Sequence, residues 1–223
     1  MKKDSEYALE RERMVEEQFL SRDIRDERVL EAMRTVPRHI FVPEEHRHFA
    51  YRDSPLPIGQ SQTISQPYIV ALMTQMLGLQ GNETVLEIGT GSGYQAAVLS
   101  QVAKEVHSVE RHDTLANQAL ACINSLDIKN VNIHVGDGTR GWPPSAPYEA
   151  IIATAAAPMV PKPLLSQLAD GGRLVIPVGG RMGQYLEIWN RDGDDFSHER
   201  MVAVAFVPLL GEFGWKDDAR DWL

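Results

Sequence analysis

The stretch VLEIGTGSGY (85–94) decides the fold class, because a short apolar strand leads directly into alternating glycines and then into a helical pattern. Glycine lets the backbone bend tightly and lets a ligand come close to the main chain. In sheets built from alternating parallel strands and helices, ligands bind at the carboxyl ends of the strands, where this turn falls. A tight turn without a ligand is the simpler alternative. We therefore expect an α/β fold with a candidate binding site at residues 89–93.

Short apolar segments alternate with helical patterns on both sides of this turn. Strands are expected at 84–88, 105–110, 131–135 and 148–154, and helices at about 66–77, 93–101, 113–126 and 161–169. Three more strands follow Gly171-Gly172, with the sequences RLVIPV, YLEIW and MVAVAFVPL. The last two are joined at 192–194 without a helix, so they are expected to be antiparallel to each other. The pattern predicts a doubly wound, mostly parallel sheet of about seven strands.

The first 60 residues follow a different pattern. Two helices are expected there, at roughly 5–21 and 26–35, the second with Asp26 as its N-cap and ending before Pro37. A turn-rich segment with further prolines follows, and it is expected to be extended and exposed because proline restricts φ and lacks an N–H donor. We therefore expect one domain over residues 1–223, with an N-terminal helical and loop extension (1–60) and an α/β core (61–223).

Composition limits the function classes. Of the 223 residues, 43% are apolar, so the chain can bury a sizeable core. The 31 acidic residues exceed the 22 basic ones, which argues against a surface that binds nucleic-acid phosphates. The single cysteine, Cys122, excludes an intrachain disulfide and a cysteine-cluster metal site, and its helical context favours a buried thiol. No apolar run approaches membrane-spanning length, so we expect a cytoplasmic protein without membrane association.

Two glutamates flank the glycine turn. Glu110 ends the next predicted strand, where an acidic side chain can accept hydrogen bonds from both hydroxyls of an adenosine ribose. Glu87 enters from the strand before the turn, and two carboxylates around one nucleotide pocket would repel a pyrophosphate. Tyr94 also stands where the dinucleotide pattern G-x-G-x-x-G needs glycine. The pair suits a ligand with a ribose, no phosphate and a positive charge. S-adenosylmethionine fits that description, and a nicotinamide dinucleotide is the less favoured alternative.

A third element follows the strand at 131–135. In VGDGTRGW (135–142), the Asp137 side chain could meet an adenine amino group, while Gly136 and Gly138 let the backbone pass close to the ligand. Gly-Asp-Gly alone is a common turn signal, so a plain turn is the alternative. Its place after the third strand of the pattern favours binding.

The polar stretch SQTISQP (61–67) precedes the helix expected at 66–77. Ser65 stands two residues before Pro67, a suitable place for an N-cap. Taken alone, the stretch therefore favours helix capping over catalysis. Its neighbours in the sequence change that interpretation.

Several blocks, in the same order along the chain, closely resemble the protein-L-isoaspartate O-methyltransferase family. They are PLPIG with SQTISQP, then VLEIGTGSGYQAAVLS, then VGDGTRGW with APYEAIIATAAAP and LLSQLADGGRLVIPVG. The resemblance runs from VPRHIFVP (36–43) to FVPLLGEFG (206–214), which is most of the chain. Ser61 departs from it, because the family usually has glycine there and serine tolerates a positive φ poorly. The segment LLGEFGW also differs, so we assign no substrate contacts to it.

The resemblance implies a class I S-adenosylmethionine-dependent methyltransferase with a Rossmann-like fold. Its reaction would be methyl transfer to the α-carboxylate of L-isoaspartyl residues in damaged proteins and peptides, which begins repair through a succinimide. A carboxylate with a pKa of about 4 is already ionised at neutral pH, so neither a general base nor a metal is required. The expected partners are isoaspartyl proteins and peptides, without nucleic acid or membrane. A monomer is expected, although the sequence leaves the oligomeric state open.

The resemblance also assigns roles to individual residues. Ser65 matches the position usually named as catalytic, and its expected role is to orient the carboxylate. The remaining matches are expected to bind the cofactor. Its methionine portion would be lined by Gly89, Thr90, Gly91 and Ser92, with Glu87 near or behind the amino group, and Thr63 and Ile64 would close over it. Glu110 would hold the ribose, and Asp137 and Gly138 would lie at the adenine.

Other interpretations remain. A nucleic-acid methyltransferase would share the cofactor half, but such enzymes typically carry an N-P-P-Y-like motif where this chain has TAAAP (154–158), with side chains small enough to admit a peptide. A methyltransferase for another carboxylate or for a small-molecule hydroxyl, and an inactive cofactor-binding member of the family, are the further alternatives. The cluster of His39, His46 and His48 is expected to be solvated or packed. Tyr94 and Trp142 either line the pocket or pack in the core.

Overall fold

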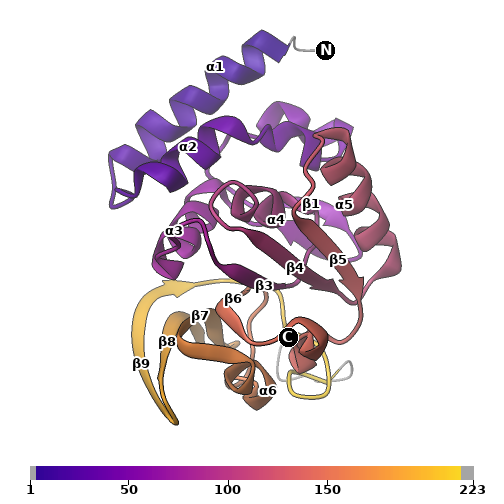
Figure 1. Ribbon diagram of the computed structural model, residues 1–223. Helices are drawn as coiled ribbons and strands as arrows, with labels where there is room; N and C mark the ends of the chain where they lie inside the picture. The colour runs from indigo at the N-terminus through magenta and orange to yellow at the C-terminus, as the bar shows by residue number, and fades with distance from the viewer. Residues whose placement is uncertain (1–3, 217–223) are drawn as a thin grey trace.

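The computed structural model of the protein describes residues 4–216 and is built on a seven-stranded sheet of order β5-β4-β3-β6-β7-β8-β9 (Figure 1). Its strands are β3 Thr84–Ile88, β4 Glu105–Glu110, β5 Val131–Val135, β6 Tyr148–Ala153, β7 Leu168–Gly180, β8 Gly183–Asp192 and β9 Asp195–Val204. The strands from β5 to β7 are parallel, whereas β8 is antiparallel to both β7 and β9. The predicted doubly wound sheet and the antiparallel final pair are therefore confirmed.

The centre of the sheet is the point at which the chain reverses direction. From β3 the chain continues to β4 and β5 on one side, and it returns to β6 and β7 on the other. Loops that leave neighbouring strands in opposite directions open a crevice at the carboxyl ends of those strands. The glycine turn after β3 lies at this crevice, beside the end of β6.

The helices largely begin and end where the sequence predicts. Their bounds are α1 Asp4–Met14, α2 Glu27–Thr35, α3 Pro67–Leu77, α4 Tyr94–Leu99, α5 Asp113–Ser125 and α6 Lys162–Ser166, and a π-helical segment, Val15–Leu20, continues α1. Asp26 caps α2 by accepting a hydrogen bond from the Arg28 N–H at 2.9 Å, as expected. The capping interpretation of Ser65 is wrong. Gln66 occupies the N-cap of α3 without a side-chain hydrogen bond, and Pro67 supplies the first helical residue.

The segment before α3 is more ordered and more buried than expected. We predicted an extended, exposed, proline-rich stretch, but β1 Leu56–Gly59 and β2 Gln62–Ile64 form an antiparallel hairpin. Leu56 and Ile58 face the interior while Pro57 between them faces outward. Alternation along a strand allows this, because proline is tolerated where its missing N–H is not needed by a partner. Upstream lie two 3-10 turns, η2 Arg38–Phe41 and η3 Glu44–Phe49, and the first of them buries Arg38 and Phe41.

Helices cover both faces of the sheet. In Figure 1, α1, α2, α3 and α4 gather above the sheet and α6 lies below it. The larger buried cluster joins side chains of the N-terminal helices, such as Phe19 and Leu30, to Met73 of α3 and to one sheet face. A smaller cluster contains Leu164 of α6 and the opposite face. The N-terminal segment thus shares its core with the sheet. No helix in residues 4–216 has the length and apolar character needed to cross a membrane.

Candidate active site

The glycine turn after β3 packs directly against the end of β6. Gly89 has a φ of +95°, and a β-carbon there would lie 2.5 Å from Thr154 Oγ1, so only glycine fits. The Thr154 hydroxyl donates a hydrogen bond to the Gly89 carbonyl oxygen at 2.6 Å. Gly93, with φ +87°, starts α4 with a β-carbon position only 3.0 Å from Ala119. These close approaches explain the glycines and hold the main chain of residues 89–92 at a pocket surface.

This pocket, the glycine-turn pocket, lies between the turn and the β1–β2 hairpin. It brings together eight of the predicted site residues: Thr63, Ile64, Ser65, Gly89, Thr90, Gly91, Ser92 and Glu110. A second hollow continues from it to Gly138, because Gln62, Gly89, Glu110 and Ala155 line both. Among the described residues, Glu110 is the one charged side chain on the wall of the glycine-turn pocket. The two hollows therefore form one elongated site, in which Glu110 belongs to both hollows and Arg111 to the second alone.

Glu110 connects the two halves of this site. Its side chain is buried, and its oxygens accept hydrogen bonds from the Gly91 N–H and the His112 N–H, both at 2.9 Å. A carboxylate has about four acceptor positions, so two remain for a ligand. The same group thus fixes the glycine turn and offers acceptors to hydroxyls placed in the pocket.

Glu87 lies beneath the pocket rather than on its wall. It is fully buried, and its Oε2 accepts a hydrogen bond from Ser108 Oγ at 2.5 Å, while Oε1 has no partner among the described residues. Ser108 Oγ also lies 2.6 Å from Thr90 Oγ1, which links Glu87 to the glycine turn. Burial raises the pKa of Glu87 to about 8, assisted by the Glu110 charge and opposed by the Ser108 hydrogen bond. Glu87 is therefore largely protonated at neutral pH.

The β1–β2 hairpin forms the opposite wall. Ser65 is half-buried; its carbonyl oxygen accepts a hydrogen bond, but its hydroxyl forms none to any of residues 4–216. The turn of the hairpin holds Gln60 and Ser61 at φ values of +50° and +56°. Ser61, where the family pattern usually has glycine, thus adopts the left-handed conformation that serine tolerates poorly. The Gln60 side chain reaches Thr114 Oγ1 of α5 at 3.3 Å, which ties the hairpin to the sheet side of the pocket.

Arg38 is a buried cation behind this wall, and sequence reasoning missed it. Its Nη2 donates to the Ser65 carbonyl oxygen and its Nε donates to the Ala50 carbonyl oxygen, both at 2.7 Å. The guanidinium lies 4.8 Å from the centre of the Tyr94 ring, and Nη1 has no hydrogen-bond partner among the described residues. Burial lowers the pKa of Arg38 to about 10, so it stays charged at neutral pH. Arg38 lies in the VPRHIFVP block, which indicates the family but does not indicate that this arginine is buried.

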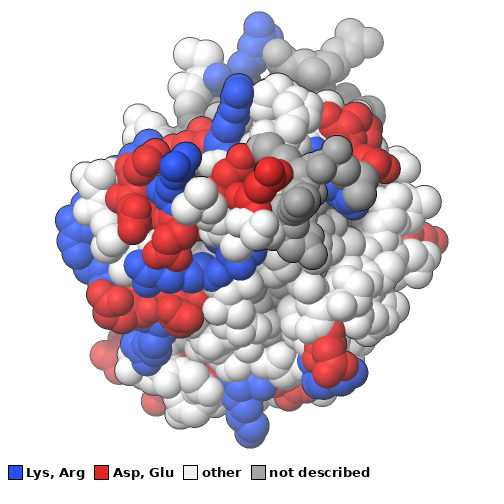
Figure 2. Space-filling model, turned by 90° about the horizontal axis from the view of Figure 1, so that it is seen from above, with Lys and Arg blue, Asp and Glu red and all other residues white. Residues whose placement is uncertain are grey.

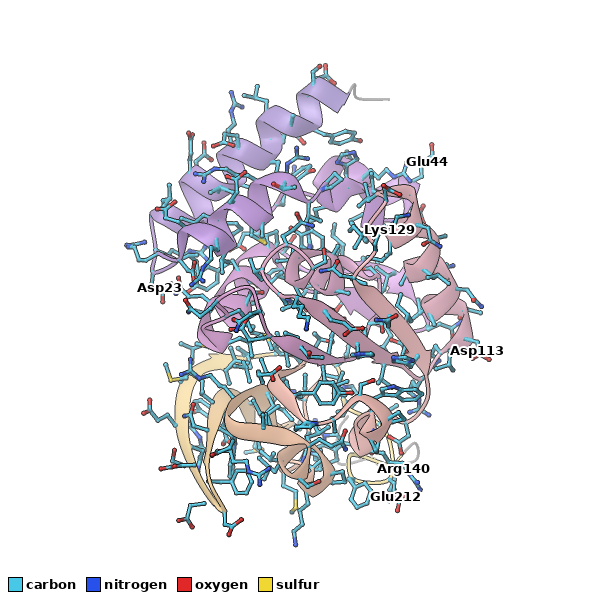
Figure 3. All side chains as sticks on the ribbon, viewed as in Figure 1. Asp23, Glu44, Asp113, Lys129, Arg140 and Glu212 are labelled. Carbon is cyan, nitrogen blue, oxygen red and sulfur yellow. The ribbon has the colours of Figure 1, made fainter. Side chains whose placement is uncertain are left out.

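Asp137 lies beside the site and holds the C-terminal segment (residues 205–216). Its Oδ1 accepts hydrogen bonds from the Thr139 N–H at 2.9 Å and hydroxyl at 2.6 Å, and its Oδ2 accepts from the Glu212 N–H at 2.8 Å. Burial would raise the pKa of Asp137, but these hydrogen bonds and the Arg140 charge outweigh it and lower the pKa. Arg140 and Glu212 form an ion pair at the same place, where Figure 3 shows them close together. The Asp137 carboxylate is therefore engaged with protein, whereas Gly138 lines the hollow.

Several open interpretations are answered by packing. Trp142 stacks on His134 with ring centres 3.9 Å apart and is not on the pocket wall. Tyr94 both lines the pocket and packs in the core, where its ring is buried against Phe41. His39 packs by stacking on a tyrosine ring.

Several pocket residues were not predicted as site residues, among them Val70 and Gln95 of the helices and Ala155 after β6. Gln62, Thr154 and Val207 line the pocket and come from the hairpin, from the end of β6 and from the C-terminal segment. In the sequence, Thr154 is only the first of a run of small side chains, and Val207 carries no polar signal. Their positions depend on tertiary contacts that one sequence does not reveal.

The outer surface carries mixed charge where it can be seen. Figure 2 looks down on the N-terminal side of the molecule and shows acidic and basic side chains interspersed, beside a broad uncharged area. The described part of this face has no continuous basic patch of the kind that follows a phosphate backbone.

Comparison with known proteins identifies the family. A family model described as protein-L-isoaspartate(D-aspartate) O-methyltransferase matches residues 9–214. Protein-L-isoaspartate O-methyltransferase 1 of Syntrophobacter fumaroxidans is 56% identical over 206 residues, which cover 92% of this chain and 96% of that protein. The protein-L-isoaspartate O-methyltransferase of a Roseiflexus species is 53% identical over 210 residues, 94% of this chain and 96% of that protein.

A solved structure agrees with the sequence comparisons. A protein-L-isoaspartate O-methyltransferase superposes with a TM-score of 0.84 at 29% identity, covering 92% of this chain and 67% of that one. The residues that the family model matches include the glycine turn, Glu110 and the β1–β2 hairpin, which line the pocket, and the Asp137 loop beside it. This chain belongs to the protein-L-isoaspartate O-methyltransferase family.

Proposed function

We propose that this chain transfers a methyl group from S-adenosylmethionine to the α-carboxylate of L-isoaspartyl residues in damaged proteins and peptides. The observation that carries the proposal is that the glycine turn with Glu110 faces, across one pocket, a Ser65 hydroxyl that has no hydrogen-bond partner among residues 4–216. Membership of the family supports the same reaction. The ester formed has a better leaving group than the free acid, so it closes to a succinimide whose opening returns some normal aspartate.

The residues present fit a cationic nucleoside. Glu110 has acceptor positions to spare for ribose hydroxyls, and no lysine or arginine of the described chain lines the glycine-turn pocket. We propose that residues 89–92 hold the methionine portion and that Gly138 lies at the adenine. Asp137 then acts on the adenine end chiefly by fixing the C-terminal segment above it. When bound, S-adenosylmethionine supplies an electrophilic methyl group on its sulfonium sulfur.

Glu87 is a second carboxyl, beneath the glycine turn, that can interact with the positive charge of the ligand. Its Oε1 is buried without a partner in the described part of the chain, an arrangement that costs free energy unless a ligand or a water satisfies it. A positive charge above the glycine turn would favour ionisation of this carboxyl, because an opposite charge nearby stabilises the charged form. We propose that Glu87 acts through the hydroxyls of Ser108 and Thr90, because hydrogen bonds between these groups connect its carboxyl to the glycine turn.

The contribution of the protein to the chemical step is positioning. A substrate carboxylate is already ionised, so the Ser65 hydroxyl need only donate a hydrogen bond that aims one oxygen lone pair at the methyl carbon. Thr63 lies beside it on the same wall. Arg38 fixes the carbonyl of Ser65 and hence the course of this strand end. Such alignment, together with exclusion of water by the hairpin, is a recognised source of rate enhancement.

The proposal is tested with labelled S-adenosylmethionine and a pair of peptides that differ only in isoaspartate or aspartate at one position. Label is expected in the isoaspartyl peptide alone, and it should be released by mild base, as an ester is. Equal labelling of both peptides, or of neither, would contradict the proposal. A Ser65→Ala variant provides the matched control, because it should bind the cofactor but label the peptide slowly.

We also propose the wider setting of this activity. Residues 1–223 act as a single domain, in which the N-terminal extension (1–60) is packed on the S-adenosylmethionine-binding core (61–223), and the shared buried cluster supports this. The protein acts as a monomer in the cytoplasm on isoaspartyl proteins and peptides. The formal charge of −9 at pH 7 supports a protein that stays apart from its own copies and from nucleic acid. Sedimentation equilibrium checks the oligomeric state.

A further inference from the structure

A third hollow, the Ser65 groove, begins where the glycine-turn pocket ends. Thr63, Ser65, Thr154 and Val207 line both, so the groove opens directly from the place assigned to methyl transfer. One of its other walls is formed by the start of α3 and residues that precede it. Another is formed by the end of β9 and the residues that follow it. The residues on these walls that matter most are Pro55, Tyr68, Ile69, Val202, Val204 and Phe206.

The groove changes in chemistry along its length. The residues that it shares with the pocket include three hydroxyls, whereas the walls from α3 and β9 are aliphatic or aromatic. Arg22 is the one charged side chain among the described residues that line it. Val202, on the β9 wall, keeps 38% of its surface exposed. A ligand in the groove would therefore meet polar groups at Ser65 and apolar groups beyond.

Arg22 is held in a defined place on this wall. Its Nη2 lies 2.8 Å from Asp53 Oδ2, and its guanidinium lies 4.3 Å from the centre of the Tyr68 ring. Asp53 also accepts a hydrogen bond from the Tyr68 N–H, and the Tyr68 hydroxyl donates to Asp23 at 2.6 Å. Figure 3 places Asp23 at the side of the molecule on which β9 lies. An arginine has five N–H donors, so Arg22 keeps donors for a further partner.

We propose that the Ser65 groove binds the residues that flank the methylated isoaspartyl residue, prefers a large apolar side chain among them, and disfavours a basic one through Arg22. This inference rests on the proposed function, because it takes the isoaspartyl carboxylate to lie at Ser65. A residue seated there has its neighbours in the chain outside the pocket, and the groove is continuous with that seat. Burial of an apolar side chain against the α3 and β9 walls favours binding. A lysine beside Arg22 meets a like charge, which the ion pair with Asp53 reduces, and it cannot accept a hydrogen bond from the remaining N–H donors of Arg22 as a glutamate can.

The experiment uses isoaspartyl peptides of one sequence with leucine, glutamate or lysine at each position next to the isoaspartyl residue. The full chain is assayed with each peptide, and kcat and KM are obtained separately. Three variants are compared: Val202→Glu, Arg22→Gln and, as a matched control, Met201→Glu. Met201 is the preceding residue of β9, is similarly exposed at 42%, and does not line the groove. Thermal melts and cofactor Kd are recorded for every variant.

The wild-type protein should use the best leucine peptide about tenfold better in kcat/KM than its lysine counterpart, the size expected for burying one apolar side chain. Val202→Glu should remove most of this preference by raising KM, with cofactor Kd unchanged, while Met201→Glu behaves as wild type. Arg22→Gln should remove the discrimination of about threefold between the glutamate and lysine peptides, a size typical of an exposed charge pair. Equal use of all peptides, or equal effects of Val202→Glu and Met201→Glu, would overturn the inference. Absence of isoaspartate-specific labelling with every peptide would instead overturn the proposed function.

Discussion

Replacement of Glu87 by glutamine should stabilise the protein progressively as the pH rises. Glu87 is fully buried, and burial raises its pKa from an ordinary 4.5 to about 8. In the unfolded chain the same carboxyl is solvated and ionises at the ordinary value. Between the two values the native state therefore holds a proton that the unfolded state has lost, so stability falls as the pH rises through this window. Glutamine has nearly the same shape, accepts the Ser108 hydrogen bond and cannot ionise.

The magnitude follows from the size of the shift. Each pH unit within the window removes about 1.4 kcal/mol of unfolding free energy, because one unit of pKa is worth that amount. Near pH 5 the wild-type protein has lost only about 1 kcal/mol relative to its fully protonated state, and near pH 8 about 4 kcal/mol. The difference in unfolding free energy between Glu87→Gln and wild type should therefore grow by about 3 kcal/mol over this range. Both proteins bury a polar atom at the Oε1 position, so the free-energy cost of that burial largely cancels when the two proteins are compared.

Urea titrations followed by fluorescence, at intervals between about pH 5 and pH 8, measure this difference directly. Glu31→Gln, which makes the same change at an exposed position of α2, controls for the substitution itself. If the Glu87→Gln and wild-type curves stay parallel across the range, the carboxyl is not held protonated by burial, and the reasoning fails. A wild-type protein that becomes more stable than Glu87→Gln as the pH rises would contradict it even more strongly.

The remaining predictions concern the pocket walls. Glu110→Ala should raise the cofactor Kd at least about tenfold in calorimetry, because two hydrogen bonds to a charged acceptor are lost; an unchanged Kd would refute the ribose assignment. Ser65→Ala should lower kcat by about tenfold or more in the peptide assay with cofactor Kd within about twofold of wild type, and parallel losses in both would contradict an orienting role. Ser61→Gly should raise the unfolding free energy by about 1 kcal/mol in denaturant titrations, because Ser61 has φ +56°; a destabilised variant would show that the turn is not strained.

The order of the elements could be predicted because each carries its own local signal. The apolar runs at 84–88, 105–110 and 131–135 coincide with β3, β4 and β5 to the residue. The β1–β2 hairpin could not be predicted in the same way. Pro57 within β1 argues against a strand, and its turn is built from Gln60 and Ser61 instead of the glycine or asparagine that usually marks such a turn. Tertiary packing of Leu56 and Ile58 overrides those signals.

The same distinction applies to the site. The glycine turn and Glu110 lie next to each other along consecutive elements, so their motif and their spacing point to one ligand. Arg38 is different, because an arginine in a loop reads as a solvated charge, and nothing local shows that it will be fully buried against the Ser65 carbonyl. Asp137 carries a binding motif, but its contacts with the C-terminal segment depend on a chain that returns to it from far along the sequence.

The way in which the pocket is divided along the chain also bears on how the protein is made. A chain emerging from the ribosome can pair β3, β4 and β5 early, because they follow one another closely, but the second neighbour of β3 is β6. Thr154 follows β6, and Val207 is supplied later still. A nascent chain therefore has the glycine turn long before it has a pocket. Cofactor binding is thus a property of the almost finished protein, and cellular S-adenosylmethionine should stabilise completed molecules while leaving partly synthesised ones unaffected.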